Sequence, residues 1–294
     1  MRVTYQPYFL LLLPLLIGVC ILGYGVAQED FTWIWGAYSL SFGAYVLILL
    51  LATDAEMPVW LSGAFCLRLA LLFGLPTLSD DIYRFIWDGH LLQQGINPFD
   101  QLPGYYLQAG QQVAGLDQVL YDQLNSPGYF TVYPPIAQAS FALAAWLSPT
   151  SWWGFSLVLK TLILLIEVGN AWLLVSLLRM FRMPIRNSLL YLLNPLIIVE
   201  LTGNLHYEAV MIFFLLLAFW LLVRMKGILP AALAFAASIA AKLLPLMFLP
   251  FFIKRLGWKK AVLFFALLGV GTFLLFLPLF NEAFLGSMSS SLDL

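Results

Sequence analysis

The side chains best suited to chemistry are concentrated in one stretch, Leu78–Phe99, of an otherwise strongly apolar chain. Placed on a helix at 100° per residue, four charged residues of this stretch fall within an arc of about 100°. They are Asp80, Asp81, Arg84 and Asp88. The opposite side of the helix is apolar, and Gly95 and Asn97-Pro98 are expected to end it. One face therefore offers three carboxylates and a guanidinium, and a solvated surface helix is the simpler alternative.

Further polar candidates lie downstream, at the edges of apolar runs: Tyr133, Glu200, Asn204, His206, Glu208 and Lys242. A pocket built from these groups and the acidic helix would have bases on one side and a cation on the other. It would suit a reaction in which a hydroxyl loses a proton to a nearby base while an anionic group departs next to a cation. An ordinary hydrogen-bonding role for His206 and a turn role for Asn204 remain open.

The composition indicates the environment of these residues. Of 294 residues, 62% are hydrophobic and 10% are charged, whereas soluble domains carry about 25% charged residues. The mean hydropathy is +0.92. The chain is therefore interpreted as a polytopic membrane protein. Two cysteines within apolar runs and two histidines argue against a disulfide framework or a zinc site. Nothing in the sequence indicates a nucleic-acid partner.

Hydropathy divides the chain into expected membrane spans and one large loop. The expected spans cover residues 8–26, 31–51, 58–75, 152–178, 188–200, 207–223 and 261–280. A cleaved signal peptide is the alternative interpretation of the first of these. The run 135–147 is shorter than the roughly 20 residues that a crossing needs, and the run 227–253 is broken at Lys242. Residues 76–133 are too polar to span and are expected to carry interfacial helices.

The positive-inside rule orients these segments. Placing Arg2 and the basic loops 179–186, 224–226 and 254–260 in the cytoplasm accounts for ten of the 14 basic residues. Residues 76–133 then lie on the outer side. The run 135–147 must dip into the membrane without crossing, and residues 227–253 must form a hairpin with Lys242 near its outer turn. Such broken helices are tolerated where they line a cavity or are buried in protein.

Four basic residues fall outside the cytoplasmic loops: Arg68, Arg84, Lys160 and Lys242. Ionisable groups within spans are costly and usually functional. The alternatives are a buried pair with a carboxylate or a side chain that reaches the interface. Lys160 and Glu167 lie seven residues apart on one helix face, which favours a structural pair as much as a functional role.

Several motifs together resemble a known family. The chain has SDDIYRFIWDG followed by INPF, then YPP, NPLIIVELTGNLHYEAV and KLLPL. In this order they resemble the polyprenyl-phosphate-dependent mannosyltransferases of the C-type (GT-C) integral-membrane glycosyltransferase superfamily, from about Leu75 to about Phe280. The resemblance implies an all-α, polytopic transmembrane helical bundle with a large outer loop. Residues 1–294 are expected to form a single membrane domain, shortened at its C-terminal end relative to the family.

The resemblance also implies roles for the candidate residues. Asp80 or Asp81 would be the general base, with Asp81 slightly favoured, and Lys242 and Arg84 would bind the donor phosphate. The other candidates would line the substrate pocket: Asp88, Tyr133, Glu200, Asn204, His206 and Glu208. The reaction would move a hexose, mannose by the resemblance, from a polyprenyl phosphate to a glycan or lipid acceptor with inversion. No cofactor is expected, although carboxylates can bind a divalent metal.

Two other functions stay open on the sequence alone. Charged residues within spans and broken helices also suit a transporter or flippase of lipid-linked sugars. A non-catalytic membrane subunit is the third possibility. For the enzyme, the expected location is a bacterial inner membrane, with the active site facing the periplasm or outside.

Overall fold

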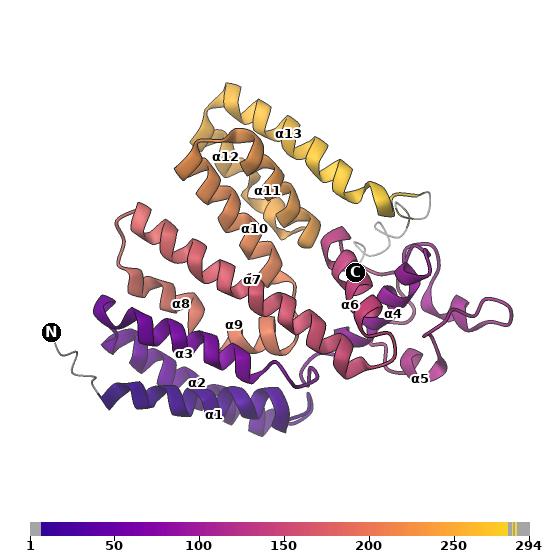
Figure 1. The fold of residues 1–294 in the computed structure, drawn as a ribbon, viewed down its shortest axis with the longest axis horizontal. Coiled ribbons are helices and arrows are strands. Elements are labelled where there is room, and N and C mark those ends of the chain that lie inside the picture. Colours follow the sequence, from indigo (N-terminus) through magenta and orange to yellow (C-terminus); the bar gives the residue numbers. More distant parts are fainter. Residues whose placement is uncertain (1–6, 282–283, 285, 287–294) are drawn as a thin grey trace. The chain divides into compact units, whose positions relative to one another are not determined.

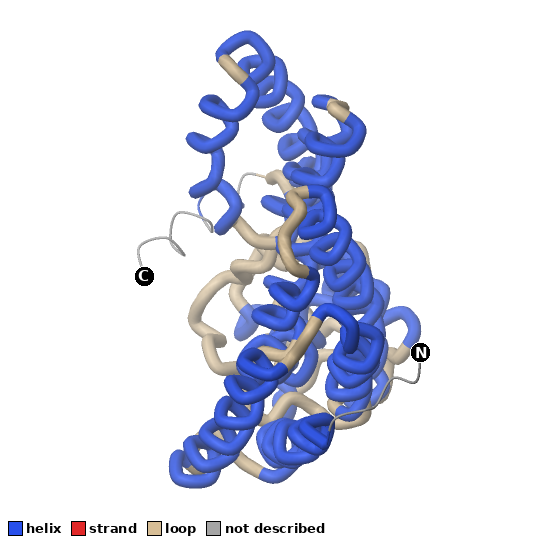
Figure 2. Tube along the Cα trace, turned by 90° about the vertical axis from the view of Figure 1, so that its left-hand side faces the viewer, coloured by secondary structure: helices blue, strands red, loops and turns tan. Residues whose placement is uncertain are grey.

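The computed structural model describes residues 7–281, 284 and 286, and over this part the chain consists of helices and loops without a strand (Figure 2). The all-α architecture expected from the sequence is confirmed. Contacts divide the chain into two units. The first contains Met1–Ser79 and Lys160–His206, and the second contains Asp80–Leu159 and Tyr207–Leu294. The division falls within one long helix, α7 (Trp152–Met180) (Figure 1).

The first unit is built from the N-terminal helices and the middle of the chain. Besides most of α7, its α-helices are α1 (Leu12–Cys20), α2 (Phe31–Leu51), α3 (Met57–Ala70), α8 (Leu189–Leu192) and α9 (Pro195–Ile197). A π-helical turn, Ile198–Gly203, follows α9. The apolar core of this unit includes Leu15, Ile48 and Trp60, each 0% exposed. The apolar composition of α1 to α3 predicts that each of these helices has an apolar surface facing this core.

Helix ends within the first unit are closed by buried cations. Helix α3 ends at Ala70, which leaves the carbonyl group of Leu71 without an intrahelical donor. The Nζ of Lys160 donates to that carbonyl oxygen over 2.9 Å. The Nη1 of Arg68 donates to the carbonyl oxygen of Leu192 over 2.7 Å, where α8 ends. Buried backbone acceptors are costly when unpaired, so these two cations stabilise interrupted helices.

A buried ion pair in the first unit corrects one expectation from the sequence. The carboxylate of Glu167 pairs with Arg68, whose Nε and Nη2 lie 2.9 and 2.8 Å from Glu167 Oε2. Tyr191 and Asn170 donate to the other oxygen, Oε1. The expected partner Lys160 instead bonds the Leu71 carbonyl. The helical periodicity of α7 therefore predicted the wrong partner for Glu167, because the actual partner, Arg68, comes from α3.

The second unit contains the acidic helix and the C-terminal helices. Its α-helices, besides the start of α7, are α4 (Asp81–Gln93), α5 (Gln118–Tyr121), α6 (Pro135–Leu147), α10 (Glu208–Trp220), α11 (Ile228–Ala241), α12 (Leu249–Leu256) and α13 (Trp258–Phe276). Helices α10, α11 and α13 pack around Phe235, Phe252 and Phe264. The rings of Phe252 and Phe264 stack with centroids 4.8 Å apart. This aromatic core holds the C-terminal helices together.

Helices α4 and α6 cross at very close range in the second unit. A Cβ atom on Gly89 of α4 would lie 2.6 Å from the carbonyl oxygen of Phe141 in α6. Phe141 also stacks on Phe85, with ring centroids 4.4 Å apart. Only glycine permits this approach, and the approach brings the polar groups of α4 next to those of α6.

Four helical segments are long and apolar enough to cross a membrane: Phe31–Leu51, Trp152–Met180, Glu208–Met225 and Trp258–Leu279. Shorter apolar helices are Phe9–Gly25, Pro135–Leu147 and Ile228–Ala241. The segment 188–200, expected to be one span, folds as short helical pieces interrupted at Asn194-Pro195. Proline removes a backbone donor and restricts the residue before it, which explains the interruption.

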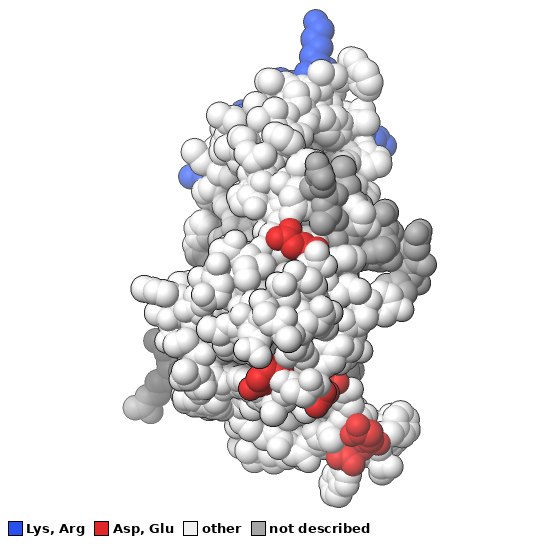
Figure 3. Space-filling view, turned by 90° about the vertical axis from the view of Figure 1, so that its right-hand side faces the viewer, with Lys and Arg blue, Asp and Glu red and all other residues white. Residues whose placement is uncertain are grey.

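The break expected at Lys242 is present. Helix α11 ends at Ala241, Lys242 follows in an extended conformation, and the chain returns through α12. In Figure 3, the visible Lys and Arg side chains are spread over the upper part of the view. The basic loop 254–260 lies at the turn between α12 and α13, and its cytoplasmic position stays a prediction.

Candidate active site

The three carboxylates of the acidic helix have different environments. Asp80 precedes α4 and is exposed, whereas Asp81, the first residue of α4, is partly buried. Asp88 is 0% exposed. The sequence placed all three on one accessible face, but residues Arg84 to Leu91 are buried around the whole helix. Asp81 is therefore the carboxylate that is both accessible and held by neighbours.

The neighbours of Asp81 come from the segment that precedes α6. The amide Nδ2 of Asn125 donates to Asp81 Oδ1 over 3.0 Å. The hydroxyl of Tyr133 also donates to the Asp81 carboxylate. Burial raises the pKa of Tyr133 well above its ordinary value, and the nearby Asp81 charge raises it further. Tyr133 thus remains a proton donor that orients the carboxylate.

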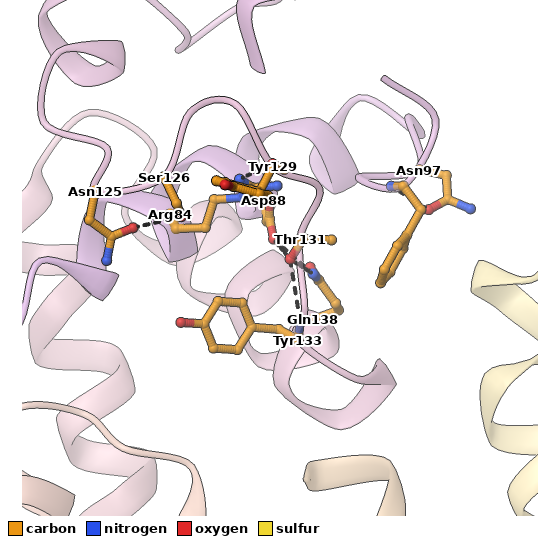
Figure 4. A network of polar contacts seen from close by, with 10 residues as sticks. Arg84, Asp88, Asn97, Asn125, Ser126, Tyr129, Thr131, Tyr133 and Gln138 are labelled. Atoms are coloured by element: carbon orange, nitrogen blue, oxygen red, sulfur yellow. Dashed lines mark hydrogen bonds and ion pairs between the residues drawn. The ribbon is translucent and has the colours of Figure 1, made fainter. Parts of the chain in front are cut away.

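Asp88 lies at the centre of a buried polar network (Figure 4). Its Oδ1 pairs with Arg84 Nε at 3.0 Å. Its Oδ2 accepts from the hydroxyl of Thr131 over 2.5 Å and from Nε2 of Gln138 over 2.8 Å. Arg84 also donates from Nη1 to the carbonyl oxygen of Tyr129 over 3.0 Å. In Figure 4, Thr131 and Gln138 lie on the same side of Asp88.

An aromatic cluster connects this network with the start of α10. Tyr133 packs edge-on against Phe85, with ring centroids 4.8 Å apart, and Tyr207 packs against Phe141 at 5.3 Å. Phe85 and Phe141 are the stacked pair at the crossing of α4 and α6. The hydroxyl groups of Ser140 and Tyr207 are hydrogen-bonded. Tyr133 and Tyr207 therefore both pack against the Phe85–Phe141 pair within the second unit.

Glu208 follows Tyr207 and forms an ion pair with Lys242. The Lys242 side chain is 43% exposed and that of Glu208 is 28% exposed. The pair joins the first turn of α10 to the end of α11. It lies in the same unit as Asp81, and Glu208 directly follows Tyr207 of the aromatic cluster along the chain.

The remaining predicted residues form a cluster of their own in the first unit. Glu200, in the π-helical turn, accepts from the hydroxyl of Tyr38 and from Nδ2 of Asn204, each over 3.2 Å. The Nδ1 of His206 lies 3.3 Å from Glu200 Oε2. Leu205, between these residues, has a positive φ of 62°, a backbone conformation that is strained for a non-glycine residue and is often found at functional sites.

Sequence reasoning missed Thr131, Gln138, Asn125 and Tyr38. Gln138 has a recognisable signal, because it is the one amide side chain within the apolar run 135–147. Thr131 lies two residues before Tyr133 but has no pattern of its own. Among the described residues, no three His, Cys, Asp or Glu side chains are grouped so as to hold a metal ion.

The structure has helices able to cross a membrane. It also has carboxylates and a cation in connecting segments and at helix ends. This arrangement is expected of a membrane glycosyltransferase. Comparison with known families identifies the group. The model of the MptA_B family, described as "Alpha-(1->6)-mannopyranosyltransferase, N-terminal domain", matches residues 14–257, and the chain belongs to this family. The resemblance to a GT-C-like mannosyltransferase family is therefore confirmed.

A curated relative agrees with this assignment. The chain is 28% identical over 147 residues to "Alpha-(1->6)-mannopyranosyltransferase B" of Corynebacterium glutamicum. The alignment covers 50% of this chain and 24% of that protein, so the chain spans a minor part of this relative's length. No solved structure matches the chain.

Proposed function

We propose that this protein transfers mannose from a polyprenyl-phosphate donor to a hydroxyl group of a glycan or lipid acceptor, with Asp81 as the general base. The observation that carries the assignment is the position of Asp81, which is partly exposed at the start of α4 and held by Asn125 and Tyr133. Family membership supports the class of reaction. The exposed Asp80 lacks this fixed setting.

The chemical step follows from this arrangement. Asp81 accepts the proton of the acceptor hydroxyl, and the hydroxyl oxygen forms a bond to the anomeric carbon of mannose. The bond between that carbon and the phosphate oxygen breaks, and the polyprenyl phosphate departs with the electron pair. Attack from the side opposite the phosphate inverts the anomeric centre. General-base catalysis of this kind contributes about 10²–10⁴-fold to the rate.

Lys242 is the proposed ligand of the departing phosphate. Its side chain is 43% exposed, and an ammonium group stabilises negative charge that develops on a leaving group. In the structure Glu208 neutralises this charge, and phosphate would compete with the Glu208 carboxylate for it. Arg84 is the weaker candidate, because it is 5% exposed and already bonded to Asp88. Glu200, Asn204 and His206 remain predicted pocket residues.

The proposal places the acidic helix on the outer side of the membrane. The exposed basic residues of the loop 254–260 support a cytoplasmic position for the α12–α13 turn. Single cysteines at the exposed Gln111 and Lys259, in a chain lacking Cys20 and Cys66, test it. A membrane-impermeant maleimide applied to intact cells should label Gln111→Cys but not Lys259→Cys, and the reverse pattern would contradict the orientation.

Reconstituted transfer tests the enzyme itself. Vesicles with the full chain, polyprenyl-phosphate mannose and candidate acceptors should show transfer that falls about 10²–10⁴-fold in Asp81→Asn. Asp80→Asn and Asp122→Asn, both at exposed positions, serve as comparisons and should retain transfer within a few-fold. Transfer that persists in Asp81→Asn removes this base. Exchange of the lipid-linked sugar across the vesicle membrane without transfer would favour the flippase alternative.

A further inference from the structure

Asp88 was expected to line a substrate pocket, but its carboxylate is 0% exposed and its two oxygens are occupied by protein donors. The donors come from three places: Arg84 of α4 itself, Thr131 of the segment before α6, and Gln138 within α6. A buried carboxylate with this many charge-assisted hydrogen bonds fixes the groups around it. It cannot contact a substrate without first losing those partners.

The hydroxyl of Thr131 is also occupied in this network. Its hydroxyl donates to Asp88 Oδ2 over 2.5 Å and accepts from Gln138 Nε2 over 3.1 Å. The same oxygen is the acceptor for the backbone N–H of Tyr133, at 3.4 Å. The Thr131 hydroxyl therefore links the fixed carboxylate of Asp88 to the backbone N–H of Tyr133.

Arg84 anchors the other end of the same segment. It pairs with Asp88 through Nε and donates through Nη1 to the carbonyl oxygen of Tyr129. At one end of this segment the Tyr129 carbonyl is bonded directly to Arg84, and at the other end the Tyr133 N–H is linked to Asp88 through the Thr131 hydroxyl. This segment has no helix or strand of its own, so these side-chain bonds determine where it lies.

We propose that Asp88 and Thr131 are positioning residues, which hold the backbone of Tyr133 so that its hydroxyl meets the carboxylate of Asp81. This rests on the proposed function in assigning the base to Asp81. Asp81 and Asp88 lie seven residues apart on α4, and the segment 129–133 connects them on the outside of the helix. Misplacement of catalytic groups by about 1 Å can lower a rate about 10²-fold, so the network is required for catalysis without touching substrate.

Hydrogen exchange of the Tyr133 backbone amide tests the positioning without any activity measurement. Thr131→Val removes the hydroxyl and keeps the shape, whereas Thr131→Ser keeps the hydroxyl. The Tyr133 amide should exchange about 10-fold faster in Thr131→Val and in Asp88→Asn, the factor expected for one lost hydrogen bond. It should be protected as in wild type in Thr131→Ser and in the control Asp122→Asn. Unchanged exchange in Thr131→Val and Asp88→Asn would overturn the inference.

Kinetics of the full chain then separate positioning from general stability. Thr131→Val should lower kcat about 10- to 100-fold with the donor KM within about 2-fold, and Thr131→Ser should restore kcat. A change in KM alone would contradict the positioning role. In an Asp81→Asn background, Asp88→Asn should lower the residual rate by no more than about 2-fold, because both changes act through the same group. If the rate losses caused by Asp81→Asn and Asp88→Asn instead multiply in the double variant, the inference is overturned even if Asp81 is the base.

The two proposals fail in different ways. Transfer that survives Asp81→Asn removes the general base, while faster exchange of the Tyr133 amide in Thr131→Val still demonstrates the positioning contact. Loss of transfer in Asp81→Asn with unchanged exchange in both network variants leaves the proposed function intact and removes the positioning role.

Discussion

Replacing Arg68 by methionine should strongly destabilise the first unit. The guanidinium is 3% exposed: its Nε donates to Glu167 Oε2, its Nη2 lies 2.8 Å from the same oxygen, and its Nη1 donates to the Leu192 carbonyl. Arg68→Met leaves a buried carboxylate without its counter-charge, and removal of one partner from a buried pair costs about 3–5 kcal/mol. The orphaned carbonyl adds about 1–3 kcal/mol where it finds no other donor.

The structure also predicts how the loss can be recovered. Glu167→Gln, added to Arg68→Met, removes the uncompensated charge and keeps an amide oxygen that can accept from Tyr191. The double variant should be about 2–4 kcal/mol more stable than Arg68→Met alone, because the remaining cost is mainly the Leu192 carbonyl. Glu167→Gln by itself should destabilise, since it leaves the guanidinium buried without an anion.

Unfolding of the purified protein in mixed detergent micelles, followed by tryptophan fluorescence, measures these differences. Arg179→Met removes an exposed arginine of α7 and should shift the free energy of unfolding by no more than about 0.5 kcal/mol. The reasoning is refuted if Arg68→Met unfolds at the wild-type midpoint. It is refuted equally if the two single losses add in the double variant, because a broken pair predicts recovery.

Three further outcomes are expected in the second unit. Gly89→Ala should destabilise by about 1–3 kcal/mol through overpacking against the Phe141 carbonyl. The control Gly36→Ala, in α2 of the first unit and with open space around it, should not lower the unfolding midpoint. Burial lowers the pKa of His90 from 6.5, so the unfolded chain binds a proton first as the pH falls. The stability from neutral His90 is therefore complete above about pH 6.5 and declines below it, and His90→Gln should reduce the drop in unfolding midpoint between about pH 7.5 and 5.5. Lys242→Gln should raise the donor KM about 10-fold or more, as expected for loss of a charged hydrogen bond to phosphate; an unchanged KM would exclude it as a phosphate ligand.

Local patterns predicted those elements whose limits are set by neighbouring residues. The helices Phe31–Leu51 and Pro135–Leu147 have the same bounds as the apolar runs, because an apolar run that ends in polar residues or begins at a proline marks a helix boundary by itself. The acidic helix was predicted as well, although it begins at Asp81 and ends at Gln93, somewhat inside the expected stretch. Lys242 was correctly predicted to interrupt the apolar run 227–253, because a charged residue there marks the end of a helix by itself.

The contacts of the site could not be read from such patterns. Asp88 is buried because Thr131 and Gln138, 43 and 50 residues further along the chain, cover it. A helical projection shows which residues share a face, but it does not show whether water or protein lies against that face. Likewise, Glu167 pairs with a residue 99 positions away rather than with the lysine two turns before it. Pairing between elements depends on tertiary packing, which hydropathy and spacing leave open.

Exposure in the structure sorts the four cations that the sequence singled out together. Lys160 is 1% exposed and Arg68 is 3% exposed, and both satisfy carbonyl groups at interrupted helices. Arg84 is 5% exposed and supports the Tyr129 backbone. Lys242, with 43% of its side chain exposed, bonds a carboxylate and, among the described residues, no backbone carbonyl, so it can exchange that carboxylate for phosphate without leaving a buried backbone acceptor unpaired. A cation in an apolar segment is therefore evidence for ligand binding only when it is not already bonded to a buried backbone carbonyl. Of these four cations, Lys242 meets this condition.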